Sequence, residues 1–263
     1  MVDQLSLRLE ADALPDLPEL RPMLPRPLPA PFDSTDHLFE PWWGGRRALI
    51  AIGPAAQPGA GEVRVTDADG TDRTAALPEL AGMAVRVAAR SAILDGELVV
   101  VDGAGRADAT ELDRRLEATP GRPVTFLAFD LLVLDGRSLL GQPLERRRQA
   151  LRRVLRPGDE VLAVPAIATE GIALFEAVAA QGIAGILARQ RSSPYLPGTR
   201  SRLWRYVAAR PGASGPGPGV GEDGAPGGTS TAGTDGPMDP AAGAGGGTGP
   251  VLALIRRLPL DEV

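Results

Sequence analysis

Apolar and polar positions between residues 32 and 210 follow the periods of both strands and helices. A short apolar run at 48–52 indicates one strand. A second run at 63–65 alternates and then enters the turn DADG at 67–70, which predicts a hairpin. The pattern therefore predicts a domain of mixed α and β structure.

The most apolar stretches lie between residues 92 and 134. The run AILDGELVVV at 92–101 indicates two strand pieces on either side of Asp95-Gly96, because this pair of residues is typical of turns. The run VTFLAFDLLVL at 124–134 predicts a strand, and the DG that follows it predicts a turn. Since this strand is nearly all apolar, we expect it at the centre of the sheet.

Two segments show helical spacing. In residues 144–155 the apolar positions fall on one side, and six arginines between Arg146 and Arg156 stand mostly on the opposite side. This arginine row either contacts DNA or is a solvated helix face. A second helix is predicted at 172–181.

The flanking segments differ in composition from the predicted domain at 32–210. Residues 1–31 are rich in Pro and Leu and predict an extended lead-in. Residues 211–250 consist largely of Gly, Pro, Ala, Ser and Thr, which predicts a flexible linker or disordered tail. Residues 251–263, VLALIRRLPLDEV, form a short apolar and basic tail that docks on the domain, binds a partner or has no role.

The composition excludes two kinds of side-chain chemistry. The chain has 263 residues and no cysteine, so disulfides, thiolate metal sites and a cysteine nucleophile are excluded. All 28 of its basic residues are arginine. A lysine amine is therefore not available for any reaction.

Charge and hydropathy indicate the expected cellular location and kinds of partner. A net charge of −5 argues against strong nonspecific binding of nucleic acid, although a local basic patch is compatible with it. The N-terminal sequence has acidic residues where a signal peptide has basic ones, and no stretch approaches the roughly 20 apolar residues of a membrane span. We expect a cytoplasmic protein without a membrane partner.

An ordered set of motifs then covers residues 20–210. These motifs are RPMLPRPLPA, FEPWWGGRRALI, LDGELVVVD, FLAFDLLVLDG and GIAGILARQRSSPYLPGTRSRLWRYV. In this order and spacing they resemble the ATP-dependent DNA ligases, particularly the ligase modules of bacterial end-joining systems. The resemblance implies an α+β fold, a DNA ligase-like nucleotidyltransferase domain with two antiparallel sheets flanked by helices. It also implies ATP and Mg²⁺ as cofactors, and the low-complexity tail predicts that no C-terminal OB-fold follows.

The resemblance places Trp42 where the family has its nucleophilic lysine. Gly45 and Arg47 align with the family's G-x-R, which fixes this register, and Gly44 aligns with an acidic position. The family begins its reaction by attack of the lysine amine on the α-phosphate of ATP, which requires a neutral nucleophile. An indole has no basic lone pair, so we predict no catalytic residue at Trp42.

Other family positions have also lost their charge. Ala68 aligns with an arginine, Ala184 with a metal-binding glutamate, and Tyr206 and Ala208 with two lysines. Arg189 aligns with a further lysine and could still hold a phosphate. These losses predict weak binding of ATP and Mg²⁺ and no metal site.

Four retained residues, Arg47, Glu97, Phe129 and Arg189, define a vestigial nucleotide-binding pocket by the same resemblance. Each also has an ordinary structural explanation. Phe129 in an apolar strand suits the core, Glu97 suits a local ion pair, and Arg47 suits a brace at the sheet edge.

Trp42 and Trp43 are expected to fill the vacated pocket, and an exposed anchor for a protein partner is the alternative. His37 is the one histidine of the chain and could in principle carry a phosphoramidate. Nothing near it in the sequence resembles a base, an orienting acid or a phosphate cradle.

The sequence therefore predicts a DNA ligase-like protein of DNA repair and recombination that is catalytically inactive because Trp42 replaces the lysine. One alternative is an active ligase or nucleotidyltransferase with rearranged chemistry, and another is a protein-interaction module. The expected partner is DNA or a DNA repair protein, with weak or no autonomous DNA binding.

Overall fold

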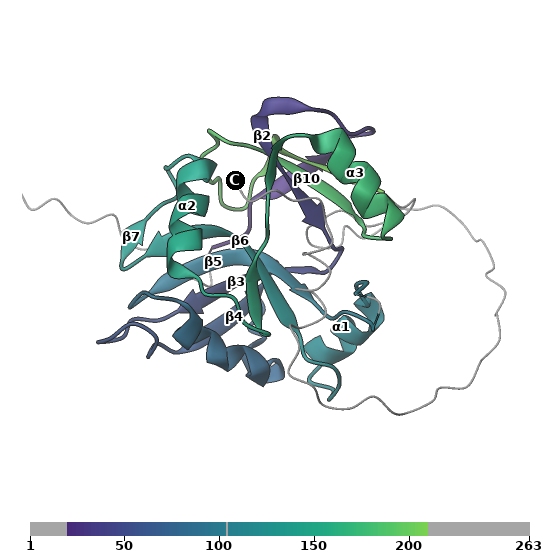
Figure 1. Cartoon of the computed structure of the whole chain (residues 1–263). Coiled ribbons are helices and arrows are strands. Elements are labelled where there is room, and N and C mark those ends of the chain that lie inside the picture. Colours follow the sequence, from purple (N-terminus) through teal and green to yellow (C-terminus); the bar gives the residue numbers. More distant parts are fainter. Residues whose placement is uncertain (1–19, 104, 210–263) are drawn as a thin grey trace, which may run out of the picture.

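The computed structural model describes residues 20–103 and 105–209. The predictions for the first 19 residues of the lead-in, the linker at 211–250, the tail at 251–263 and a missing OB-fold lie outside these ranges. The described chain forms two sheets flanked by helices, as Figure 1 shows. This confirms the predicted α+β fold.

The larger sheet has six strands in the order β4-β3-β5-β6-β7, with β8 beside β6. Its strands are β3 (Arg46–Ile52), β4 (Val63–Asp67), β5 (Ala92–Val99), β6 (Thr125–Leu134), β7 (Arg137–Ser138) and β8 (Val161–Ala163). All pairs are antiparallel except β6 with β8. The apolar run of β6 is buried at eight of its ten positions, which agrees with its central place.

The smaller sheet has five strands in the order β1-β11-β10-β2-β9. Its strands are β1 (Leu24–Pro27), β2 (Ser34–Trp42), β9 (Ile167–Thr169), β10 (Gly185–Gln190) and β11 (Arg200–Ala208). β1 runs parallel to β11, and the other pairs are antiparallel. The lead-in predicted at 1–31 lies partly within the domain, because β1 joins the sheet and Met23 is fully buried.

Helices cover the sheets. α1 (Ala109–Leu116) lies beside β5, α2 (Leu144–Val154) packs on β6, and α3 (Gly171–Ala180) packs on β2 and β10. Two 3₁₀ helices, η1 (Thr74–Ala76) and η2 (Pro78–Arg86), lie next to β4. None of the helices in the described ranges is long and apolar enough to cross a membrane.

Two local predictions are wrong, both because buried charges were not foreseen. β5 is a continuous strand with a bulge at Asp95/Gly96, because Asp95 is fully buried in an ion pair and does not form a turn. On α2, Arg147 and Arg148 are buried and do not belong to an exposed arginine row. The predicted hairpin turn is observed, since Thr66 bridges to Asp72.

The predicted turn after β6 is also present. Asp135 and Gly136 both have positive φ angles, 47° and 78°, and connect β6 to β7. Such a turn favours glycine at its second central position, so the DG pair explains the sharp reversal.

Candidate vestigial nucleotide site

The candidate site lies where the chain passes from one sheet to the other. β2 belongs to the smaller sheet and β3 to the larger one, so the turn at residues 43–45 connects the two sheets. Trp42 ends β2, and Arg47 lies on β3 opposite Glu97 of β5. The site therefore draws side chains from both sheets, as the resemblance implies for a nucleotide site.

Trp42 is 1% exposed and packs in an apolar cluster. This cluster, which we call the tryptophan cluster, consists of Trp42, Ala184, Leu187, Tyr206 and Ala208. The rings of Trp42 and Tyr206 meet edge to face, with centroids 5.5 Å apart. Four of its five members, all except Leu187, stand at positions where the resemblance predicts charged residues in the family. The residues at these positions, which are far apart in the sequence, therefore pack together in one apolar cluster.

Trp43 is 2% exposed and belongs to the neighbouring cluster between the sheets and α3. Since both tryptophans are buried, the alternative of an exposed partner-binding anchor is wrong. The indole nitrogen of Trp43 has no hydrogen-bond partner within the described residues. The prediction was that the pair fills the vacated pocket, but only Trp42 lines the small cavity of the candidate site, and Trp43 packs in the neighbouring cluster.

Glu97 is directed at the turn between the sheets. Its carboxylate accepts a hydrogen bond from the backbone N–H of Gly45. A Cβ at residue 45 would lie 2.1 Å from the carbonyl oxygen of Leu98, so only glycine allows this close approach. Burial raises the pKa of Glu97 to about 7, and the hydrogen bonds from Gly45 and Trp43 oppose that rise. Glu97 therefore holds the turn of its own chain.

The raised pKa predicts a pH-dependent stability that Glu97→Gln abolishes. Glu97 holds its proton more tightly in the folded protein than at the ordinary value of 4.5, so its contribution is complete below about pH 4.5 and is lost as the pH rises through 7. At about 1.36 kcal/mol per pKa unit this loss is about 3 kcal/mol. Urea unfolding of both proteins from pH 4 to 8 should show the free energy of Glu97→Gln rising relative to wild type. Parallel curves would contradict the assignment.

Arg47 is engaged by Asp95 on the neighbouring strand. Two parallel hydrogen bonds of 2.6 Å join its Nε and Nη2 to the two carboxylate oxygens. The hydroxyl of Tyr195 donates to the same carboxylate at 2.7 Å, and Nη2 of Arg47 donates to the carbonyl of Met23 at 3.2 Å. The pair with Asp95 raises the pKa of Arg47 against the opposing effect of burial. Arg47 therefore braces β3, β5 and the segment before β1.

Phe129 is 3% exposed, and two guanidinium groups lie over its ring. The Cζ atoms of Arg47 and Arg189 are 4.4 and 4.2 Å from the ring centroid. Arg189 also lies 5.0 Å from the ring of Trp204. Contacts of this kind are attractive because the face of an aromatic ring carries negative potential. The aromatic ring that the resemblance places in the nucleotide-binding pocket is thus covered by the protein's own arginines.

Buried ion pairs that the sequence did not reveal hold Arg189 and two arginines of α2, Arg147 and Arg148. Glu40 of β2 pairs with both Arg148 and Arg189, and all three side chains are at most 3% exposed. Arg147 pairs with Asp130 at 2.8 Å, and both are fully buried. The sequence signal that could have revealed these ion pairs is a single acidic residue within an apolar strand, because a buried carboxylate requires a partner.

The space left between these groups is very small. A cavity of about 10 Å³ is lined by Trp42, Gly45, Arg47, Glu97, Phe129 and Leu187. This is about the volume that one water molecule requires, whereas small-molecule pockets usually measure about 300–1,000 Å³. The cavity is therefore much smaller than a nucleotide, and within the described ranges no group of three or more His, Asp and Glu residues is placed to hold a metal ion.

His37 lies at the other end of β2, opposite Gln190, whereas Trp42 lies opposite Gly185. Its Nδ1 is 2.9 Å from the hydroxyl of Ser34, and its ring meets Phe32 edge to face. Burial lowers the pKa of His37. The structure does not bring His37 to the candidate site.

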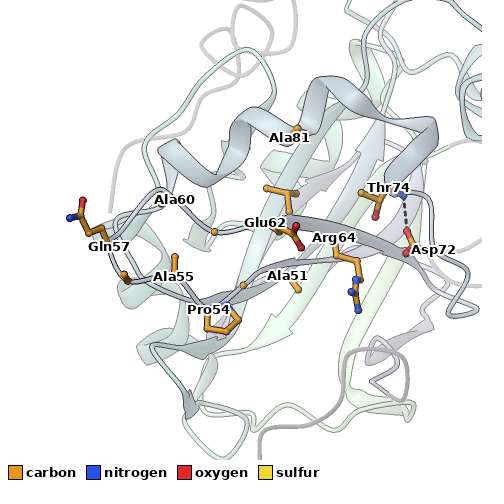
Figure 2. A pocket seen from close by; sticks show the side chains of 14 residues that line it. Ala51, Pro54, Ala55, Gln57, Ala60, Glu62, Arg64, Asp72, Thr74 and Ala81 are labelled. Carbon is orange, nitrogen blue, oxygen red and sulfur yellow. Dashed lines mark hydrogen bonds between the residues drawn. The ribbon is translucent and has the colours of Figure 1, made fainter.

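A larger hollow of about 1120 Å³ lies elsewhere, beside β4 and the loop that precedes it. Figure 2 shows it between this loop and η2, lined mainly by small side chains such as Ala55, Ala60 and Ala81. Asp72 at its rim accepts a hydrogen bond of 2.8 Å from the backbone of Thr74. None of the residues of the candidate nucleotide site lines this hollow.

Comparison with known proteins agrees with the geometry. The family model described as ATP dependent DNA ligase domain matches residues 23–206. A solved structure described as mycobacterial DNA ligase D complexed with ATP and MES superposes with a TM-score of 0.63 at 30% identity, over 73% of this chain and 61% of that one. The ligase domain of Mycobacterium tuberculosis LigD gives a TM-score of 0.61 at 31% identity, over 73% and 60%. The fold is therefore that of a DNA ligase nucleotidyltransferase domain.

Curated relatives extend the comparison. The multifunctional non-homologous end joining DNA repair protein LigD of Mycobacterium tuberculosis is 35% identical over 167 residues, which are 63% of this chain and 21% of that protein. DNA ligase C1 of Mycolicibacterium smegmatis is 31% identical over 211 residues, 72% of this chain and 57% of that protein. The chain thus spans less than two thirds of each. The chain belongs to the ATP-dependent DNA ligase domain family.

Proposed function

We propose that this protein is a ligase-like member of its family that does not form an adenylate and serves DNA repair as a folded scaffold. The observation that carries the proposal is Trp42, an indole buried at the position of the reactive lysine and packed against three further positions that have lost their charge. The chain has no lysine, and His37, the other side chain that could carry a phosphoramidate, lies away from the candidate site, so we infer that no nucleophile replaces the amine.

The contacts made by the residues of the pocket support the same proposal. Arg189 could have held a phosphate, but its guanidinium pairs with Glu40 and stacks on Phe129. Glu97 is occupied by the backbone of Gly45. Residues that would bind ATP therefore bind other parts of the protein, and Mg²⁺ has no carboxylate at Ala184.

The partner that we propose is DNA or a DNA repair protein, as the names of the relatives suggest. The protein's own contribution to DNA binding is weak, because its net charge is −5 and the buried Arg147 and Arg148 are not available to phosphates. The exposed arginines of α2, Arg146, Arg152 and Arg153, remain accessible.

Incubation with α-³²P-labelled ATP and Mg²⁺ tests the proposal. We expect no labelled protein on a denaturing gel, because there is no nucleophile, and no heat of ATP binding in calorimetry, because the pocket is filled. The ligase domain of Mycobacterium tuberculosis LigD serves as the positive control. A covalent adenylate on this protein would refute the proposal and favour an active enzyme with rearranged chemistry.

The variant Trp42→Lys separates the two causes of inactivity. It restores the amine but leaves Ala184, Tyr206 and Ala208 without charge and Arg189 on Phe129. We expect this variant to remain unlabelled as well. Labelling of Trp42→Lys would show that the pocket still accepts ATP, contrary to the filled site that we describe.

A further inference from the structure

The exposed side of α3 is unusually apolar for a helix at the surface. α3 has the sequence GIALFEAVAA and buries Gly171, Leu174 and Val178 against the smaller sheet. Its outward positions are Ile172, Ala173, Glu176, Ala179 and Ala180. A surface helix normally carries polar residues on its outer side, and one that is apolar all round is normally covered.

The outward positions form one continuous stripe, which we call the α3 stripe. They follow the spacing i, i+1, i+4, i+7 and i+8, so they stand above one another along the helix. Ile172 is 41% exposed at one end, and Glu176 is the single charge. Figure 1 shows α3 on the outer side of β2 and β10, with no other described element over it.

The chain leaves the described domain next to this helix. β11 ends at Ala208, opposite Gly185, and the backbone N–H of Ala209 donates to the carbonyl of Ala184 at 2.8 Å. α3 ends at Ala180, four residues before Ala184. Whatever follows residue 209 therefore starts beside the C-terminal end of the α3 stripe.

The segment at 251–263 has a composition that complements the stripe. Val251, Leu254, Ile255 and Leu258 recur at i, i+3, i+4 and i+7, the spacing of one apolar helix face. Arg256 and Arg257 offer positive charge. On the domain, Glu176 lies within the stripe and Glu170 precedes α3, and neither carboxylate forms an ion pair within the part of the chain that the structure describes.

The length of the connection allows contact. A Gly-rich chain of n residues has a mean end-to-end distance of about 5–6 Å × √n, which is about 35 Å for the stretch between residue 209 and residue 251. α3 itself is about 15 Å long at 1.5 Å per residue. A connection of this number of residues is long enough for residues 251–263 to meet any part of α3, and tethers of such length give effective concentrations of about millimolar order.

We propose that residues 251–263 dock on the α3 stripe of the same chain. The apolar residues of the segment cover Ile172 and the alanines, and Arg256 or Arg257 pairs with Glu176. Docking closes the apolar surface of α3 and returns the far end of the linker to the domain. It is independent of nucleotide chemistry at Trp42.

Paramagnetic relaxation in the full chain tests this docking. Because the sequence has no cysteine, Ala253→Cys allows a single nitroxide label to be attached within the segment. We expect this label to remove the amide NMR signals of residues 172–180, with the same effect at different protein concentrations. A label at Ser230→Cys, about midway between residues 209 and 251, should broaden those signals much less than the label at residue 253.

Two matched variants in the labelled protein locate the contact. Ile172→Glu places a charge on the stripe and should restore the α3 signals. Val85→Glu changes an apolar residue that is 68% exposed on η2, and should leave the broadening in place. Intact α3 signals in the unsubstituted labelled chain would overturn the proposal, and so would broadening that Ile172→Glu does not relieve. Broadening that increases with concentration would point to a second copy as the occupant and would also overturn it.

Discussion

Replacing Glu40 with leucine is expected to lower the free energy of unfolding by about 3–5 kcal/mol, because removal of one partner leaves buried charge without compensation. The effect should be at the upper end of that range, since Glu40 pairs with two arginines, Arg148 and Arg189. Both guanidinium groups would remain in the interior with less than 4% of their side chains exposed. Urea unfolding followed by circular dichroism measures this loss.

An exposed ion pair supplies the control. Arg46 and Asp113 meet at 2.8 Å, but their side chains are 50% and 47% exposed. Asp113→Leu should therefore change stability by about 1 kcal/mol or less. If Glu40→Leu were no worse than Asp113→Leu, the buried network would not hold the arginines as described.

Trp42→Ala is expected to lower the free energy of unfolding by about 3–5 kcal/mol, the usual cost of truncating a large buried aromatic side chain. The loss arises from the contacts with Leu187 and Tyr206 and from the cavity that the indole leaves. An apolar cavity of this kind can bind a small aromatic molecule. Added indole should therefore raise the melting temperature of the variant and leave that of the wild-type protein unchanged.

The same variant also tests whether removing the Trp42 side chain is enough to let ATP bind at the candidate site. ATP should not replace indole as a stabilising ligand, because Arg47 and Arg189 still cover Phe129. Stabilisation of Trp42→Ala by ATP would contradict this account. A loss below about 1 kcal/mol would contradict tight packing of the indole.

The sequence predicted those elements whose signal is local. The apolar run before the DG turn specifies β6 by itself, and the helical spacing at 144–155 specifies α2. The Asp95-Gly96 pair was predicted to form a turn and does not. Its turn preference is weak compared with the buried ion pair between Asp95 and Arg47. That pair joins residues far apart in sequence, and no local pattern reveals it.

The candidate site was predicted only as far as each position could be compared with the family motif. The motif comparison predicted that Trp42, Ala184, Tyr206 and Ala208 differ from the family, but not that their side chains lie in one cluster. It also assigned Arg189 to a phosphate, whereas the structure places it on Phe129. The position of Arg189 depends on its ion pair with Glu40. Glu40 is buried because β2 pairs with β10 inside the sheet, and the composition of β2 does not indicate this.

The parallel pairing of β1 with β11 has a consequence for synthesis on the ribosome. The six-stranded sheet is built from a continuous part of the chain, β3 to β8, and can assemble as soon as that part has emerged. The five-stranded sheet needs residues 24–27 and 200–208 together. Its first strand must therefore wait, with its hydrogen-bonding edge unpaired, until nearly the whole domain has been translated. An arrest peptide placed at increasing distances along the nascent chain should record two separate folding events.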